Sequence, residues 1–295
     1  MIVATGFFDG VHLGHRQVIR QLVKTAAARG DESMVLTFWP HPRTVLQDDA
    51  RSLRLLTTLV EKKALLTELG VDHVEVLPFS RDFSRWTARE YLEEVVIGRY
   101  GGRAILLGYD NRLGSDGLDP EAIARLAASL GLDVIRPECV AAGRSLAPGA
   151  AISSTRIRKE LEEGRVEEAA AMLGYAYRLH GVVVAGNRLG RTIGFPTANM
   201  QLYEPLKLVP ANGVYQVAVE TLGQSFTGMC NIGVRPTVGT GNARTIETHI
   251  LDFDEDIYGL DITISFLRKV RDERRFDSLE DLRAQLEKDR EFCFQ

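Results

Sequence analysis

The spacing of the apolar residues changes once along this chain, near residue 178. Up to that point short β-propensive runs alternate with helical stripes, the pattern of a parallel sheet with helices on both faces. From His180 onward apolar residues recur in steps of two, as in Tyr215, Val217 and Val219. We therefore predict a Rossmann-like α/β domain over residues 1–178. A small antiparallel β-barrel with a C-terminal helix is predicted over residues 179–295.

The strands of the first domain are predicted at residues 2–4, 34–38, 73–77 and 104–107. Capping signals at residues 87–90 and 119–120 open two of the intervening helices. Ligands of parallel sheets bind at the carboxyl ends of the strands. The loops that follow the first and fourth strands are therefore the expected edges of a binding site.

The loop after the first strand contains His12 and His15 among glycines, just before a predicted helix. Backbone N–H groups at a helix start attract phosphate, so both histidines can be expected to neutralise charge on a phosphate. Two other interpretations fit an isolated H-x-x-H: surface or capping histidines, and a zinc pair, which would need a third ligand. The glycines and Asp9 in this loop favour the phosphate site.

A second polar cluster begins a helix predicted after residue 152. Ser154 and Thr155 stand there beside Arg156 and Arg158. Serine and threonine are favoured helix caps, whereas the guanidinium of an arginine can donate hydrogen bonds to two phosphate oxygens. Helix capping and a phosphate clamp both fit these residues.

Two polar clusters stand out in the predicted barrel. Thr197 and Asn199 are two apart in an extended segment and project oxygens to one side. They suit either Mg²⁺ between ATP phosphates or a turn stabilised by polar side chains.

Glu247 shares a face with His249, Leu251 and Phe253 by strand alternation, so its carboxylate is predicted beside residues that line the barrel. It suits either an exposed strand end or a general base that takes a proton from an alcohol.

Composition excludes several classes of protein. A net charge of -4 argues against a general nucleic-acid binder, and the three cysteines are too scattered for a disulfide framework. There is no basic signal-peptide region, and no apolar run approaches the roughly 18 residues of a membrane span. We expect a cytoplasmic monomer or weak homo-oligomer that binds neither nucleic acid nor membranes.

Together these motifs resemble the bacterial bifunctional riboflavin kinase/FAD synthetase family. Residues 6–15 and 152–158 look like the family's nucleotidyltransferase motifs, and residues 194–199, 231–237 and 247–249 look like its riboflavin kinase motifs. The resemblance implies that the barrel phosphorylates riboflavin to FMN with ATP and that the α/β domain adenylylates FMN to FAD.

The resemblance also implies roles for individual residues. In the kinase, Glu247 would be the base, Thr197 and Asn199 would hold Mg²⁺, and the ATP phosphates would meet Gly190, Arg191 and Gly194. In the adenylyltransferase, His12, His15 and Arg158 would act on the triphosphate. The remaining predicted nucleotide contacts there are Gly6, Phe7, Gly14, Ser154, Thr155 and Asp110.

The loop at residues 113–117 departs from the family pattern. Leu113 stands where the family usually has phenylalanine, and Ser115 and Asp116 replace basic residues. A second hypothesis is therefore a flavin-binding or flavin-sensing protein with only one active domain. A tRNA-charging enzyme is disfavoured by the acidic balance and by the lack of a recognisable tRNA-binding domain.

Overall fold

The computed structural model describes residues 1–46, 53–108, 112–137, 152–186, 189–236 and 242–294. They form two compact units, Met1–Ser154 and Thr155–Gln295. Within the described ranges, no helix combines the length and apolar character that crossing a membrane requires.

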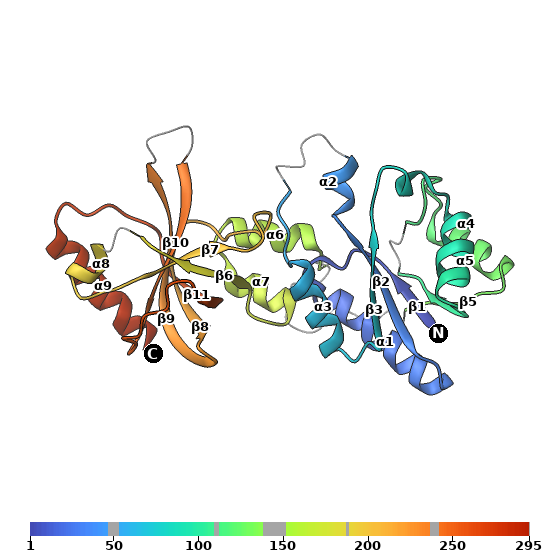
Figure 1. Ribbon diagram of the computed structural model, residues 1–295, viewed down its shortest axis with the longest axis horizontal. Coiled ribbons are helices and arrows are strands. Elements are labelled where there is room, and N and C mark those ends of the chain that lie inside the picture. Colours follow the sequence, from blue (N-terminus) through green and yellow to red (C-terminus); the bar gives the residue numbers. More distant parts are fainter. Residues whose placement is uncertain (47–52, 109–111, 138–151, 187–188, 237–241, 295) are drawn as a thin grey trace. The chain divides into compact units, whose positions relative to one another are not determined.

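Among the described residues, the first unit is built on a five-stranded parallel sheet with the order β3-β2-β1-β4-β5 (Figure 1). The strands are β1 (Ile2–Thr5), β2 (Ser33–Trp39), β3 (His73–Pro78), β4 (Ala104–Leu106) and β5 (Asp133–Ile135). The predicted Rossmann-like sheet is confirmed. Strand order reverses between β1 and β4, so the loop after β1 stands where such sheets bind ligands.

The helices of this unit begin at side-chain caps. The predicted capping box at residues 87–90 opens α4, and Asp119 caps α5 as predicted. A further box formed by Thr58 and Glu61 opens α3. The helices and helical turns are η1 (Asp9–Val11), α1 (Leu13–Arg29), α2 (Pro42–Leu46), α3 (Leu59–Glu68), η3 (Phe83–Arg85), α4 (Ala88–Glu90), η4 (Tyr91–Arg99) and α5 (Pro120–Ser129).

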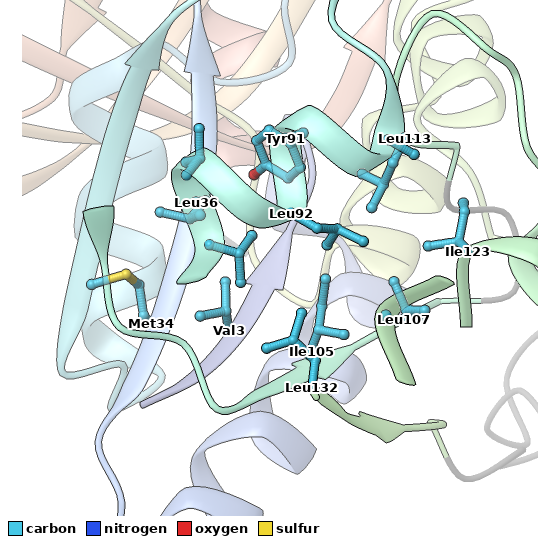
Figure 2. Packing of buried hydrophobic residues seen from close by; sticks show 14 of the residues in the cluster. Val3, Met34, Leu36, Tyr91, Leu92, Ile105, Leu107, Leu113, Ile123 and Leu132 are labelled. Carbon is cyan, nitrogen blue, oxygen red and sulfur yellow. The ribbon is translucent and has the colours of Figure 1, made fainter. Parts of the chain in front are cut away.

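One face of the sheet packs against η4 and α5 (Figure 2). Val3, Leu36 and Ile105 from three strands meet Leu92 of η4, and all four side chains are fully buried. Ile2, whose side chain points to the opposite face, is also fully buried. Because helices cover both faces, only the ends of the strands remain open to a ligand.

Within the described residues, the second unit contains a closed antiparallel barrel with the strand order β10-β7-β6-β11-β8-β9, as predicted (Figure 1). Its strands are β6 (Arg178–Val184), β7 (Ala198–Leu202), β8 (Gly213–Thr221), β9 (Gln224–Pro236), β10 (Asn242–Ile250) and β11 (Asp261–Arg271). The helices are α6 (Ser154–Glu162), α7 (Val166–Leu173), α8 (Leu189–Thr192) and the predicted C-terminal helix α9 (Leu279–Cys293).

The two units divide earlier than the boundary predicted at residue 178. Helix α7 packs on β11, and the Ala211 N–H donates to the carbonyl of Leu161 in α6 at 2.9 Å. Both helices therefore associate with the barrel. The spacing of apolar residues predicts that a helix has a buried face, but it does not predict which sheet covers that face.

Candidate functional site

The loop between β1 and α1 is held by the segment that precedes α3. The buried Asp9 carboxylate accepts hydrogen bonds from the N–H groups of Leu56 and Thr57, at 3.1 and 3.0 Å, and from the Thr57 hydroxyl at 3.2 Å. The loop backbone is strained, because Phe8 and Val11 have positive φ angles of 53° and 35°. Asp9 therefore fixes the shape of the loop.

Replacing Asp9 with alanine is expected to lower the free energy of unfolding of the first unit by about 2–4 kcal/mol, because two buried N–H groups lose their acceptor. Both tryptophans, Trp39 and Trp86, lie in this unit, so urea unfolding followed by tryptophan fluorescence measures the change. Asp82→Ala, at an exposed position, is the matched control. An unchanged urea midpoint for Asp9→Ala would contradict this structural role.

His12 caps α1. Its Nδ1 accepts a hydrogen bond from the His15 backbone N–H at 3.3 Å, so the ring proton of a neutral His12 lies on Nε2. The His12 and His15 rings stack with their centroids 3.6 Å apart. The capping interpretation is correct for His12, and capping makes its Nε2 a hydrogen-bond donor.

His15 is half-buried, and its Nδ1 has no hydrogen-bond partner among the described residues. Burial lowers the pKa of His15 well below its usual value, and the charges of His12 and Lys62 lower it further. His15 is therefore uncharged near neutral pH. This differs from the prediction that both histidines neutralise charge, although a neutral imidazole still forms hydrogen bonds with a phosphate.

Lys62 of α3 joins this site, although no motif pointed to it. Its side chain is fully buried, with Nζ 3.6 Å from the centroid of the Phe7 ring and 3.3 Å from the Thr37 hydroxyl. Burial lowers the pKa of Lys62 to about 8, and the charge of Asp9 acts in the opposite direction. The sequence held one signal: Lys62 falls within the apolar stripe of its own helix, three residues after Leu59.

Raising the pH from about 8 to 10.5 is expected to stabilise the first unit through Lys62. The unfolded chain keeps this proton up to the ordinary pKa of 10.5, whereas the folded chain releases it above about 8. The unfolded state thus binds more protons in this window, and stability rises with pH by at most about 3 kcal/mol. Urea unfolding of the wild-type chain and Lys62→Met at about pH 7.5 and about pH 10 checks this. A stability difference between the two chains that is constant with pH would contradict it.

The Ser154 hydroxyl donates to the Asp9 carbonyl at 2.9 Å. It therefore holds Ser154 against the histidine loop, and both belong to the first unit. Thr155 and Arg158 belong to the second unit, and their place at the phosphate stays a prediction.

The glycines of the loop allow close packing. A Cβ at Gly14 would lie 3.3 Å from the His12 ring, and a Cβ at Gly6 would lie 3.1 Å from the Phe8 ring. Larger residues would push these rings aside. Asp110, predicted to lie near the nucleotide, falls outside the described residues.

The residues that depart from the family pattern anchor their own loop. Leu113 is buried in the core near η4 (Figure 2). The Ser115 N–H donates to the Trp86 carbonyl at 2.8 Å, and the Asp116 carboxylate accepts from the Ala88 N–H at 3.1 Å. Ser115 and Asp116 thus hold the start of α4 through hydrogen bonds, and Leu113 fills the core.

In the barrel, Glu247 of β10 is paired with two asparagines. It lies opposite Asn199 of β7 on one side and Asn231 of β9 on the other. Directly opposed residues of neighbouring strands point to the same face. The carboxylate and both amide side chains therefore share one face, and Asn231 is a member for which no role was predicted.

His249 holds the segment that leads to Thr197. Its Nδ1 lies 2.8 Å from the Pro196 carbonyl oxygen, which can only accept, so Nδ1 carries a proton. The ring also packs edge-on against Phe195, with centroids 5.1 Å apart. Burial lowers the pKa of His249, which favours its neutral form with the proton on Nδ1. His249 therefore fixes this segment against β10.

The turn before this segment needs its two glycines. The Phe195 N–H donates to the Gly190 carbonyl at 2.8 Å, and a Cβ at Gly190 would lie 2.1 Å from the Phe195 oxygen. Gly194 has a φ of 86°, which favours glycine. Arg191, between them, is exposed.

A cavity of about 400 Å³ opens beside this turn, and its wall includes Arg191 and Thr197. Ala198 and Thr248 also line it. Since side chains alternate along a strand, their neighbours Asn199 and Glu247 point to the opposite face. The structure thus brings Glu247 and Asn199 together and sets Thr197 at the cavity.

The prediction that the Glu247 face lines the barrel is wrong. Leu251, on the Glu247 side, packs with Phe195, Met229 and Cys293 of α9. Phe253 lies beyond the end of β10 and lines the cavity instead. Both faces of β10 are partly apolar because α9 covers one of them, so alternation alone could not identify the inner face.

The chain was compared with known proteins. Residues 1–156 match the family model for FAD synthetase, and residues 173–295 match the model for riboflavin kinase. Bifunctional riboflavin kinase/FMN adenylyltransferases from Listeria monocytogenes, Bacillus subtilis and Escherichia coli are 38%, 34% and 36% identical to it, over 98% of this chain and 90% of each relative. The crystal structure of a macrolide-efflux protein from Streptococcus pneumoniae is 32% identical, with a TM-score of 0.89 over 100% of this chain and 93% of that one.

Proposed function

The chain belongs to the family of bifunctional riboflavin kinase/FMN adenylyltransferases, and we propose that its two polar clusters divide the two reactions between them. The protein phosphorylates riboflavin to FMN with ATP and adenylylates FMN to FAD. We assign the first reaction to the barrel and the second to the α/β unit. The assignment rests on the pairing of Glu247 with Asn199, which sets a carboxylate beside an amide oxygen on one face of neighbouring strands.

In the barrel, Glu247 takes the proton from the terminal ribityl hydroxyl of riboflavin. The hydroxyl oxygen attacks the γ-phosphorus of ATP, the bond to the bridging oxygen breaks, and ADP leaves. Arg191, exposed in the turn between Gly190 and Gly194, forms hydrogen bonds with phosphate oxygens of ATP. His249 positions the segment that carries Thr197.

Thr197 and Asn199 would hold Mg²⁺. Hydroxyl and amide oxygens are ligands that this hard cation accepts, and the Glu247 carboxylate opposite Asn199 makes the surroundings favourable for a positive charge. When bound, the ion supplies charge neutralisation on the phosphates of ATP.

In the α/β unit, a phosphate oxygen of FMN attacks the α-phosphorus of ATP. The bond to the β-phosphate oxygen breaks and pyrophosphate leaves. No covalent enzyme intermediate is needed, so the residues act by positioning and by stabilising charge. His12 and His15 hydrogen-bond the triphosphate, and Arg158 adds charge. The other assigned contacts are Gly6, Phe7, Gly14, Ser154, Thr155 and Asp110.

We propose further that the protein works in the cytoplasm, as a monomer or weak homo-oligomer, without binding nucleic acid. Its net charge of -4 supports the last point, because nucleic-acid binders normally present a basic face.

Incubation with riboflavin, ATP and Mg²⁺, followed by chromatographic separation of the flavins, tests the assignment. We expect FMN to appear first and FAD to follow. Absence of FMN would contradict the kinase role. FMN without FAD would instead support the second candidate, a flavin-binding protein with one active domain, which the unusual residues 113–117 favour.

A further inference from the structure

The buried position of Lys62 is energetically unfavourable for its charged side chain. Its side chain is fully buried, and among the described residues its ammonium makes one hydrogen bond, to the neutral Thr37 hydroxyl. Its other close partner is the face of the Phe7 ring, at 3.6 Å. A buried charge usually has a carboxylate or phosphate as partner, because leaving water costs several kcal/mol. Neither of these two contacts supplies a negative charge.

The surroundings of Lys62 are those of the adenylyl-transfer loop. The charge of Asp9 acts on Lys62, and the charge of Lys62 acts on His15. His12 acts in turn on His15. The Asp9 carboxylate already accepts hydrogen bonds from residues 56 and 57, so it is committed to holding the loop. His15 presents a buried Nδ1 without a partner among the described residues. Among the described residues, a buried cation whose hydrogen bond and ring contact carry no negative charge and a ring nitrogen without a hydrogen-bond partner thus lie at one loop.

We propose, given the adenylyltransferase function assigned to this unit, that Lys62 is a positioning residue for the triphosphate of ATP. Its ammonium is a fixed positive charge behind the Phe7 to His15 loop, and it attracts the phosphates without touching them. In a region of low dielectric constant such a charge acts over several ångströms. It also holds the Phe7 carbonyl in place, because the Thr37 hydroxyl to which it donates itself donates to that carbonyl at 3.2 Å.

This role has a measurable signature. Methionine has a similar length and no charge, so Lys62→Met removes an unfavourable buried charge and keeps the packing. We expect Lys62→Met to raise the urea midpoint of the first unit and to weaken ATP binding there by about 10- to 100-fold. If Lys62 only supported the fold, Lys62→Met would instead lower the urea midpoint.

The experiment uses the full chain. Urea unfolding and ATP titration are both followed by fluorescence of Trp39 and Trp86, which lie in the first unit. Lys62→Arg keeps the charge and should retain more ATP affinity than Lys62→Met. Lys63→Met, at the exposed neighbouring position, is the matched control and should leave both quantities unchanged. A cooperative urea transition shows that the first unit of each variant is folded, and formation of FMN shows that the barrel is intact.

A lower urea midpoint for Lys62→Met, or an ATP affinity equal to that of the wild type, would overturn the proposal. Failure of the assigned function is a separate result: the wild-type chain would then bind ATP in this unit but make no FAD from FMN.

Discussion

Replacing Glu247 with glutamine is expected to slow the formation of FMN from riboflavin by roughly 10²- to 10⁴-fold, the usual contribution of a general base. Glutamine keeps the size and the polarity of the side chain beside Asn199 and Asn231, the residues opposite it. It cannot take a proton from the ribityl hydroxyl. The loss should therefore fall on kcat, which steady-state kinetics with riboflavin and ATP would measure.

The same variant should convert supplied FMN to FAD at the wild-type rate, since Glu247 lies on β10 of the barrel, to which the kinase reaction is assigned. Glu220→Gln, at an exposed position of β8 in the same barrel, serves as the control and should leave both reactions unchanged. If Glu247→Gln lost both reactions equally, the two units would depend on one another and the assignment of one reaction to each would be wrong.

Replacing His15 with alanine is expected to have the reverse effect, slowing the conversion of FMN to FAD by about 10²- to 10³-fold, the usual cost of losing one group that stabilises transition-state charge. His15 is the better test of the two histidines. Its Nδ1 has no partner among the described residues, whereas His12 also caps α1, so its removal would cost stability too.

Production of FMN by His15→Ala should match the wild type, and chromatography of the flavins from one reaction would read both steps. His73→Ala, at a half-exposed position of the same unit, controls for loss of a histidine. A kinase defect in His15→Ala would count against the division of the two reactions between the two units.

The secondary structure could be predicted because its signals are local. The capping box at residues 87–90 lies within one helical turn, and the alternation of Tyr215, Val217 and Val219 within one strand. The change of apolar period near residue 178 was enough to separate a parallel sheet from a barrel. The histidines of the loop after β1 could be proposed as site residues, because loops positioned by a rigid sheet often carry binding and catalytic residues.

The site itself depended on contacts that the sequence does not encode locally. Lys62 meets Phe7 and Asp9 meets Thr57 only after α3 has packed against η1 and β3, so neither pair leaves a spacing to recognise. Helices α6 and α7 could be predicted as helices, but only packing assigned them to the barrel.

The sequence by itself determined which segments are strands and helices and which residues are candidates for the chemistry, since periodicity and side-chain type are properties of short segments. The tertiary structure alone decided that Glu247 points away from the barrel interior and that a buried lysine stands behind the histidine loop. Both outcomes follow from burial, because the packing of α9 on the barrel and of α3 against η1 determines which side chains leave water.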